Sequence, residues 1–397
     1  KKTGITYIVV TDKNGAEGFF KLNVEPQGTN YIAYPQVQPG FYHTVALKAD
    51  GTVWAWGRNG GGQLGNSNTN NQLLPVQVKG GASGSEYLTD VVQVTAGNWH
   101  SMALKANGTV YAWGWGQYGQ LGNGYTTNRD DTDKYSYEKI YSAPVQVLNG
   151  AQTSETGYLK EVVQIDAMGG TGRSESNRFG TSLAVTESKE VYGWGNSLYG
   201  ALGVKSSIVS KPVRVGTDIS NAVQVAGGGK SGSDDWHVNS IGNTGYTYIL
   251  KEDGTVSSLG YNVNGELGNG TKASTTAVQK VSNLTEIMQV AGSKNGNFGA
   301  AVKEDGTVWT WGSNINGELG SGKKNNTNLP VQVLTGEQDS DSGFLENIIQ
   351  VSAGSNHVIA LDSDGAIWSW GYNNHSQLGR DVTTYTPANL PGKITTI

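Results

Sequence analysis

Thr109-Val110-Tyr111-Ala112-Trp113-Gly114, with Leu121-Gly122 shortly after it, is the stretch that decides the fold of this chain. A strand of this kind occurs six times, and the Gly of Leu-Gly always comes nine positions after the Trp, or after Leu259 in the fourth copy. The distance between copies varies. A unit that is constant inside and variable between copies indicates a structural repeat with inserted loops. The Trp or Leu positions of the six copies are Trp56, Trp113, Trp194, Leu259, Trp311 and Trp370.

The second copy predicts four strands. Residues 91–94 are an apolar run suited to a buried inner strand, and residues 100–104 form the next strand. Asn107-Gly108 is a hairpin signal, because both residues tolerate the positive φ of a tight turn. Residues 109–113 alternate as a strand should, and residues 144–147 begin with a Pro that suits an edge strand. Four antiparallel strands per repeat, arranged around a ring, are the blades of a β-propeller.

The composition excludes several classes of protein. The 397 residues contain no Cys, which excludes a disulfide framework or a thiolate metal site and is compatible with export. The formal net charge of −5, without a basic run, argues against nucleic-acid binding. No apolar stretch approaches the roughly 20 residues of a membrane helix, so membrane insertion is not expected. With neither an initiator Met nor a signal peptide, we expect a mature product or an excised piece.

Three motifs resemble the regulator-of-chromosome-condensation repeat family. They are a Gly-x-x-His-Ser/Thr-x-Ala-Leu phrase at 97–104, Asp-Gly-x-Val-Trp-x-Trp-Gly at 50–57, and Gln-Leu-Gly at 63–65. The resemblance covers roughly residues 34–397 and implies a β-propeller, usually of seven blades. Six copies are visible, which leaves three alternatives. Either terminal strands build a seventh blade, or the ring has six blades, or the sequence is a shortened piece of the propeller. We expect a closed ring, because an open one exposes two sheet edges.

The fold class predicted is therefore all-β, with a propeller of six to seven four-stranded blades at residues 31–397, seven being favoured by the resemblance. Residues 1–30 lie outside the repeat and predict a β-hairpin around Asp12-Lys13-Asn14-Gly15. This hairpin resembles the end of the immunoglobulin-like modules of bacterial surface proteins. A lone hairpin is marginal in water. It therefore packs on the propeller, completes a blade, belongs to an upstream domain, or pairs with another subunit by strand addition.

The histidines do not form a catalytic set. His43, His100 and His357 each lie 13 residues before the Trp of their copy. A residue present once per blade indicates packing, with the imidazole hydrogen-bonded to backbone near the shaft. His237 lies beside Asp234, Asp235 and Trp236, a cluster that fits a metal or ligand site or a polar loop.

No other motif predicts an enzyme. Asp362-Ser363-Asp364-Gly365 lacks the late Glu of a calcium loop and is interpreted as a hairpin turn. The sequence contains neither a phosphate-binding glycine loop between strand and helix nor a nucleophile elbow with plausible partners. We therefore predict no catalytic residue, no metal and no cofactor.

Long loops on one face of the ring are the predicted functional surface. If the strands of a blade are called A to D, the A–B and C–D loops share one face because the strands alternate in direction. The long insertions 123–143, 170–180 and 229–245 all lie in such loops, and exposed Tyr, Trp and Arg favour recognition. The candidate binding face consists of Arg129, Asp131, Lys134, Tyr135, Tyr137, Tyr141, Arg173, Arg178, Asp234, Asp235, Trp236 and His237.

The opposite face has a structural signal. Segments 79–90, 148–160 and 334–346 are similar to one another and end in an aromatic-Leu pair. We expect these pairs to anchor the crossing from one blade to the next. They are Tyr87-Leu88, Tyr158-Leu159 and Phe344-Leu345.

These observations favour a non-enzymatic binding or adhesion module of an exported bacterial surface protein, located outside the cell or on its surface. Its ligand would be a protein or a glycan. The alternative is a structural subunit of an extracellular assembly or filament that self-associates through the N-terminal hairpin. The resemblance also implies nucleotide exchange on a small GTPase or inhibition of an enzyme, but no contact motif for either can be matched residue by residue.

Overall fold

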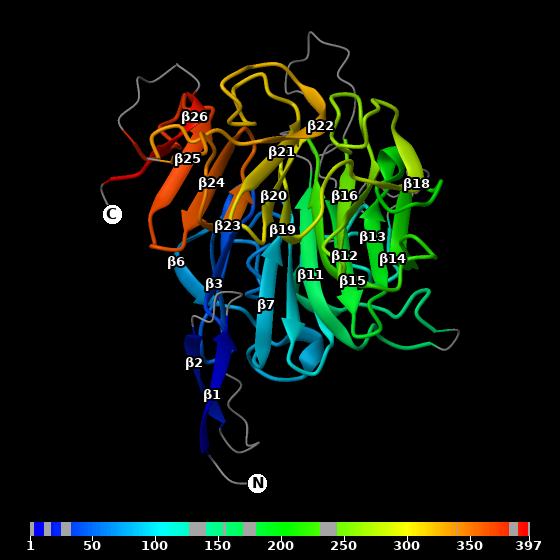
Figure 1. The fold of residues 1–397 in the computed structure, drawn as a ribbon. Coiled ribbons are helices and arrows are strands. Elements are labelled where there is room, and N and C mark those ends of the chain that lie inside the picture. Colours follow the sequence, from blue (N-terminus) through cyan, green and yellow to red (C-terminus); the bar gives the residue numbers. More distant parts are fainter. Residues whose placement is uncertain are drawn as a thin grey trace.

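The structure is a computed structural model. It describes residues 4–11, 17–24, 33–126, 140–153, 156–169, 180–230, 244–338, 340–380 and 388–395. Six four-stranded antiparallel sheets form the blades of a propeller (Figure 1). The chain therefore supplies six blades, the lower of the two numbers predicted, and not the seven that the resemblance favoured.

Within each sheet the strands follow one another in chain order, and the first strand lies nearest the central shaft. Blade 1 contains β3 (Gln36–Pro39), β4 (His43–Leu47), β5 (Val53–Gly57) and β6 (Gln72–Gln77). Blade 2 contains β7 (Val91–Ala96), β8 (His100–Lys105), β9 (Val110–Trp115) and β10 (Ile140–Gln146). Blade 3 contains β11 (Val162–Gly169), β12 (Gly180–Thr186), β13 (Val191–Asn196) and β14 (Ile208–Arg214).

The second half of the ring repeats this pattern. Blade 4 contains β15 (Ala222–Gly228), β16 (Tyr246–Lys251), β17 (Val256–Gly260) and β18 (Thr275–Lys280). Blade 5 contains β19 (Ile287–Gly292), β20 (Phe298–Lys303), β21 (Val308–Gly312) and β22 (Thr327–Gln332). Blade 6 contains β23 (Ile348–Ala353), β24 (His357–Asp362), β25 (Ile367–Gly371) and β26 (Ala388–Lys393). Among the described residues, the 3-10 helices η1 (Gly81–Ser83) and η3 (Leu198–Gly200) lie in connections.

The predicted hairpin turns join the second and third strands. Gly108 has a φ of 76°, and the Asn107 side chain accepts hydrogen bonds from the Thr109 backbone N–H and hydroxyl. In the third copy, Lys189 takes the place of this Gly and still adopts a φ of 61°. The turn geometry is thus kept even where the sequence signal is lost.

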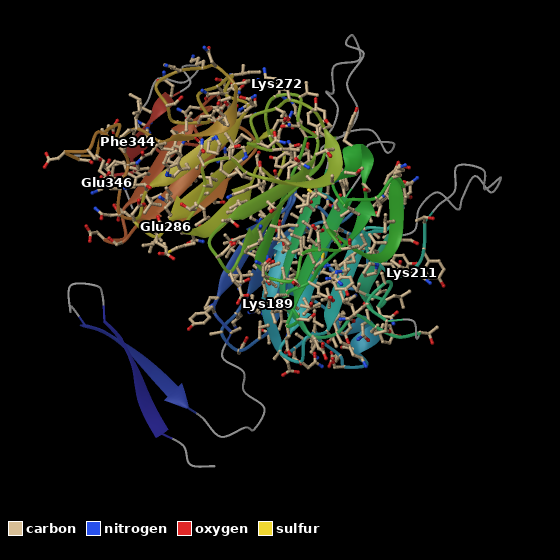
Figure 2. All side chains as sticks on the ribbon, turned by 45° about the vertical axis from the view of Figure 1, so that its right-hand side comes forward. Lys189, Lys211, Lys272, Glu286, Phe344 and Glu346 are labelled. Atoms are coloured by element: carbon tan, nitrogen blue, oxygen red, sulfur yellow. The ribbon has the colours of Figure 1, made fainter. Side chains whose placement is uncertain are left out.

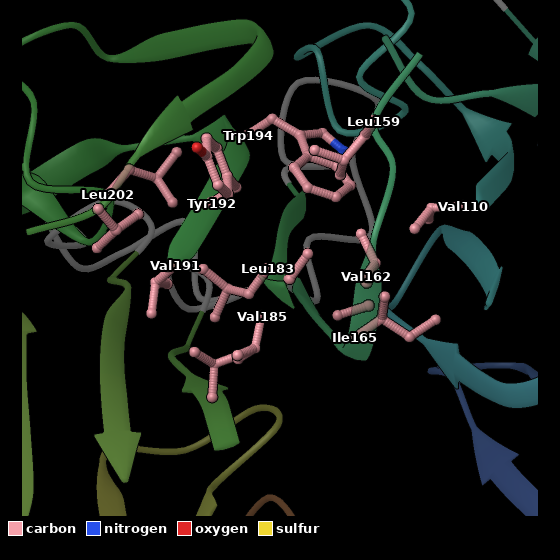
Figure 3. Close-up of a cluster of buried hydrophobic side chains, with 14 of the residues drawn as sticks. Val110, Leu159, Val162, Ile165, Leu183, Val185, Val191, Tyr192, Trp194 and Leu202 are labelled. Atoms are coloured by element: carbon pink, nitrogen blue, oxygen red, sulfur yellow. The ribbon is translucent and has the colours of Figure 1, made fainter. Parts of the chain in front are cut away.

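Tryptophans join successive blades. Trp113 of blade 2 is fully buried, and its indole N–H donates to the Gln63 carbonyl of blade 1 at 2.9 Å. Trp194, Trp311 and Trp370 repeat this contact with blades 2, 4 and 5. Figure 3 shows Trp194 among apolar side chains contributed by strands of neighbouring blades.

Glutamines of the inner strands form a second, regular link, which we call the glutamine clamp. The Gln93 amide group donates to the Ile165 carbonyl at 3.0 Å and accepts from the Ile165 N–H at 2.9 Å, so one side chain pairs with the next blade like a short strand. Gln164, Gln224 and Gln289 bind Val225, Val290 and Val351 in the same way. Gln36 accepts from the Val94 N–H but donates to the Val92 carbonyl.

The expectation of a closed ring is wrong. Five interfaces join the six blades, but no hydrogen bond connects blade 6 to blade 1 among the described residues. Gln350, the sixth clamp residue, is exposed and has no partner in this part of the chain. The five interfaces that form do not bring the last blade onto the first.

The N-terminal strands form a separate hairpin. β1 (Gly4–Thr11) pairs antiparallel with β2 (Glu17–Val24), and neither strand pairs with a blade. Figures 1 and 2 both show this hairpin outside the ring. The alternative that it completes a blade is therefore wrong for the described strands.

The aromatic-Leu pairs anchor the blade crossings as predicted. Isolated bridges join Lys79 to Tyr87, Leu148 to Tyr158 and Leu334 to Phe344. The leucines that follow, Leu88, Leu159 and Leu345, are fully buried. Each crossing segment thus folds back on itself, and its buried Leu side chain holds its end against the core.

Candidate functional site: the loop face of the ring

The A–B and C–D loops lie on one face, which we call the loop face. Every blade pairs its strands antiparallel, so the segments that join β9 to β10, β11 to β12 and β15 to β16 all leave from the same end of their sheets. These are the three long insertions that the sequence singled out. Their central residues, 127–139, 170–179 and 231–243, lie outside the described residues.

Eleven of the twelve predicted binding residues fall in those three segments, so their placement stays a prediction. Tyr141 is the one that the structure describes. It lies in β10 opposite Gly114, is half-buried against the core of blades 2 and 3, and burial raises the pKa of its phenol. The Tyr141 side chain therefore contributes to the core as well as to the surface.

Buried asparagines hold the C–D loops in place, and sequence reasoning missed them. The Asn59 side chain accepts from the Leu64 N–H at 2.9 Å and donates to Asn66 and Asn68. Asn262 and Asn314 make the same pair of contacts in blades 4 and 5, and Asn373 accepts from the Leu378 N–H in blade 6. The available signal was an Asn three residues after the Trp or Leu in four of the six copies. These loops therefore form a firm platform.

Exposed side chains of the recognition type lie on the same face, although the C–D loops of blades 2 and 3 have Gly116 and Ser197 in place of the buried Asn. Tyr42 of an A–B loop and Tyr125 and Tyr199 of C–D loops are 45%, 54% and 40% exposed. The C–D loops of blades 4 and 5 add the apolar side chains of Val263 and Ile315. Tyr and exposed apolar groups on a firm scaffold are typical of protein-binding surfaces.

Arg58 joins two blades on the loop face. Its guanidinium lies 4.7 Å from the ring centre of Trp99 and 5.4 Å from that of Tyr42. Stacking on both rings orients the planar cation while its charge remains available at the surface. Phe41 packs against Tyr42, with ring centres 4.2 Å apart.

A second aromatic pair lies between blades 3 and 4. The rings of Tyr199 and Tyr261 meet edge to face at 5.0 Å. Tyr199 adopts a φ of 61°, which costs a bulky residue of order 1–3 kcal/mol and tends to occur at functional sites. The 231–243 insertion leaves the ring in the same blade as Tyr261.

The repeated histidines are structural, as predicted, but their partner is not backbone. The His43 and His100 Nε2 atoms lie 2.9 and 3.0 Å from the hydroxyls of Ser101 and Ser182 in the next blade. Those hydroxyls donate to main-chain carbonyls, so each imidazole Nε2–H donates to the Ser oxygen. Burial lowers the pKa of His43 to about 4 and that of His100 to about 3, which keeps both rings neutral.

Charges inside the ring serve the fold. Lys294 of blade 5 forms an ion pair with Asp166 of blade 3 and donates to the Ala167 carbonyl at 2.8 Å. This pair braces the shaft, a cavity of about 810 Å³ lined by the inner strands of all six blades. Burial raises the pKa of Glu266 to about 7, although Asn264 donates two hydrogen bonds to its carboxyl group.

The part of the chain that the structure describes holds no group of three metal-ligating side chains and no helix that is long and apolar enough to cross a membrane. His237 and its acidic neighbours lie outside that part. Asp362 is hydrogen-bonded within its own hairpin, to the N–H groups of Asp364 and Ala366 and to the indole of Trp368, as a turn residue would be.

Comparison with known families decides the identity of the repeats. The regulator of chromosome condensation (RCC1) repeat matches residues 50–104, 107–167, 189–231, 305–361 and 364–397, more than half of the chain. The chain belongs to the RCC1-repeat family. A second form of the repeat matches 36–63, 91–120 and 348–377.

Relatives of this RCC1-repeat chain have diverse roles. It is 26% identical to the ultraviolet-B receptor UVR8 of Arabidopsis thaliana, over 86% of this chain and 78% of the receptor. It is 29% identical to the human regulator of chromosome condensation, over 83% of this chain and 70% of the relative. It is also 29% identical to the human E3 ubiquitin-protein ligase HERC2, over 85% of this chain but only 6% of the ligase.

Solved structures share the fold. Human WBSCR16 superposes with a TM-score of 0.67 at 22% identity, covering 95% of this chain and 84% of that one. Yeast RCC1 (Prp20), solved bound to Kap60, gives 0.63 at 23% identity, covering 91% and 74%. At this level of identity the likeness establishes the fold alone.

Proposed function

We propose that this chain is a non-enzymatic binding module whose loop face recognises a protein ligand. The observation that carries the proposal is the convergence on one face of three long insertions with the exposed Tyr42, Tyr125 and Tyr199. Propeller loops held by a firm scaffold vary without cost to the core, which suits them to specific contacts. Two solved structures that share the fold support the same class: Prp20p of Saccharomyces cerevisiae, which binds Gsp1p and histones, and yeast RCC1 (Prp20) bound to Kap60.

The same proposal places the chain on the surface of a bacterium or outside the cell, as an adhesion module. Its support is the absence of Cys and the resemblance of the N-terminal hairpin to immunoglobulin-like surface modules. A protein ligand is favoured over a glycan because the described face combines an aromatic-stacked Arg with apolar groups.

A second role, assembly through the hairpin, has one specific observation in its favour. β1 and β2 pair only with each other, so both outer backbone edges are free to extend a sheet of another subunit. This role would coexist with ligand binding, since β3, the first strand after the hairpin, begins on the opposite face from the A–B loops.

The test is capture of partners from cell-envelope and culture fractions with three baits. The first is the full chain, the second has residues 127–139, 170–179 and 231–243 shortened, and the third carries Arg58→Ala with Tyr199→Ala. Tyr158→Ala, an exposed tyrosine of the opposite face, is the matched control. A protein retained by the parent and the control but lost from both loop-face variants supports the proposal.

Equal retention by all baits would contradict the loop face as the site. Each bait must first show the parent's melting temperature, so that loss of capture reports contacts and not unfolding. A glycan array is probed with the same proteins. Binding of the parent but not of the loop-face variants would indicate that the ligand is a glycan and not a protein. Equal sedimentation of the parent and a chain lacking residues 1–32 would contradict assembly through the hairpin.

A further inference from the structure

The charged side chains that reach the surface of the described A–B and C–D loops are all positive. The acidic residues in these described loops are Glu266 and Glu318, and both are buried. The cations of the same loops come from every blade except the second. They are Arg58, Lys205, Lys230, Lys272, Lys294, Lys323, Lys324 and Arg380.

Three of these cations lie on two neighbouring loops. Lys272 belongs to the C–D loop of blade 4, and Lys323 and Lys324 belong to that of blade 5. All three side chains are exposed, and none forms an ion pair with another described residue. Their charges are therefore available to a partner.

Lysines of the opposite face lie beside acidic side chains instead. At the turns and strand ends of that face, ion pairs join Lys48 to Asp50, Lys105 to Asp90 and Lys189 to Glu252. Figure 2 shows Lys272 at the top of the view and Lys189 near the bottom of the ring. The unpaired lysines are thus a property of the loop face and not of the whole surface.

The C–D loops of blades 4 and 5 form one continuous surface. The Asn326 side chain donates to the Asn264 side-chain oxygen at 3.2 Å. The Gly270 N–H donates to the Asn328 carbonyl at 2.8 Å, and the Asn328 side chain donates back to the Gly270 carbonyl at 2.7 Å. Three hydrogen bonds therefore hold the two loops in register.

The two buried carboxyl groups do not neutralise these lysines. Glu266 accepts hydrogen bonds from the backbone and the side chain of Asn264, both at 2.8 Å. Glu318 accepts the same two bonds from Asn316, at 2.8 and 2.9 Å. Each carboxyl group is thus turned into its own loop and away from solvent.

Apolar side chains stand between the lysines. Val263 and Ile315 occupy the same position, directly after the buried Asn of their loops, and are 48% and 67% exposed. Leu329, next to Gly270, is 40% exposed. The residues that match Val263 in blades 1, 2 and 6 are Gly60, Gln117 and Asn374. In these comparisons, exposed aliphatic groups occur where the unpaired lysines are.

We infer that the C–D loops of blades 4 and 5 bind an acidic segment of a partner protein that also carries an apolar anchor side chain. Lys272, Lys323 and Lys324 attract its carboxylates, and Val263 and Ile315 contact the anchor. Salt screens exposed charges, whereas burial of the apolar groups persists in salt. This inference rests on the proposed function, because it names the chemistry of the protein that the loop face takes.

A phosphate polymer fits this surface less well. Such a polymer is held by many cations that follow its backbone. Here the three lysines alternate with aliphatic groups that a phosphate backbone leaves uncovered. The charge favours an anionic partner, and the apolar groups favour a protein.

The probe is a fluorescent synthetic peptide in which aspartate and glutamate flank leucines. Two matched peptides carry lysine in place of the acidic residues or serine in place of leucine. Fluorescence anisotropy with the full chain should show saturable binding of the acidic peptide that weakens as the salt concentration rises. The serine peptide should bind more weakly, and the lysine peptide should not bind.

Variants of the two loops locate the site. Lys272→Glu, Lys323→Glu and Lys324→Glu combined should weaken the acidic peptide by about tenfold or more at low salt, because attraction becomes repulsion. Val263→Ser with Ile315→Ser should weaken it severalfold without changing the salt dependence.

The matched control has the same net charge as the triple lysine variant. It reverses three exposed lysines outside the two loops and should bind within about twofold of the parent, since distant charges are screened. These changes are Lys160→Glu, Lys211→Glu and Lys280→Glu.

Four results would overturn the inference. They are absence of saturable binding, equal weakening by the control variant, tighter binding of inorganic polyphosphate that ignores Val263→Ser and Ile315→Ser, and salt-sensitive self-association that the triple lysine variant abolishes. The third result would indicate a phosphate polymer. The fourth would indicate the acidic opposite face of a second copy.

The same variants separate this inference from the proposed function. A partner lost from the bait with shortened insertions but retained by the triple lysine variant would leave the proposed function standing and reject the acidic segment. Equal capture by all baits, together with the expected peptide binding, would support this surface and reject the insertions as the recognition site.

Discussion

Replacing Glu266 by Gln should remove a pH dependence of stability that one buried carboxyl group imposes. Glu266 is fully buried in a C–D loop, and burial raises the pKa of its carboxyl from 4.5 to about 7. The unfolded chain loses this proton near pH 4.5, while the folded chain keeps it until about pH 7. Stability contributed by this site is therefore present below pH 4.5, falls as the pH rises from 4.5 to 7, and is level above.

The magnitude follows from the difference between the two pKa values. Each pKa unit corresponds to about 1.4 kcal/mol, so ionising Glu266 in the folded chain costs about 3 kcal/mol. Gln is accommodated at this position, since Gln63 and Gln120 occupy it in blades 1 and 2 and accept the same kind of backbone N–H. Glu266→Gln should thus be about 3 kcal/mol more stable than the parent at pH 8 and similar to it at pH 4.5.

Urea unfolding at a series of pH values from 4.5 to 8.5 measures the effect. Glu318→Gln is the matched control, because the Glu318 pKa is also raised by burial but Lys230 lies near enough to oppose the rise. We expect a smaller change for it. A parent whose stability does not fall relative to Glu266→Gln between pH 4.5 and 7.5 would refute the assignment of a buried, protonated Glu266.

Three further outcomes follow from the described contacts. Trp113→Ala should cost about 3–5 kcal/mol of unfolding free energy, and Trp56→Ala only about 1–2 kcal/mol, because Trp113 is closed in by the preceding blade and Trp56 is not; equal costs in urea titrations would indicate a closed ring. Lys189→Gly should stabilise the chain by about 1 kcal/mol, because Gly adopts the positive φ of this position without steric strain. The exposed ion pair of Lys189 with Glu252, which this change removes, contributes little. A lower melting temperature of the variant would show that the ion pair contributes more than the strain costs. The imidazole NMR signals of His43 and His100 should not titrate above pH 5. The free energy of unfolding should fall as the pH drops from 6.5 toward 4, because the two imidazoles bind protons in the unfolded chain but not in the folded one. Titration near pH 6.5 would instead place these rings in water.

The strands and turns could be predicted because they depend on neighbours in sequence. Asn107-Gly108 and the alternation of Tyr111 and Trp113 act within one hairpin, so a single repeat contains the whole signal. The aromatic-Leu pairs were also interpreted correctly, since each closes a short segment on itself.

The closure of the ring could not be predicted in this way. Whether blade 6 meets blade 1 depends on the angle between blades, a sum of five interfaces in which no single residue decides. The histidine partner was missed for a related reason: Ser101 and Ser182 belong to the next blade, 58 and 82 residues away. Most of the candidate face stays a prediction because its residues lie in the three insertions.

The glutamine clamp also has an evolutionary consequence. The clamp recognises only a main-chain N–H and C=O, so it is indifferent to which apolar side chain the receiving residue carries; Ile165 and Val225 serve equally. Exchanging one apolar side chain for another at the receiving residue therefore leaves both hydrogen bonds of the clamp in place, so this position can vary without a matching change of the glutamine. Repeats joined in this way can differ in their loops while the hydrogen bonds between neighbouring blades stay the same.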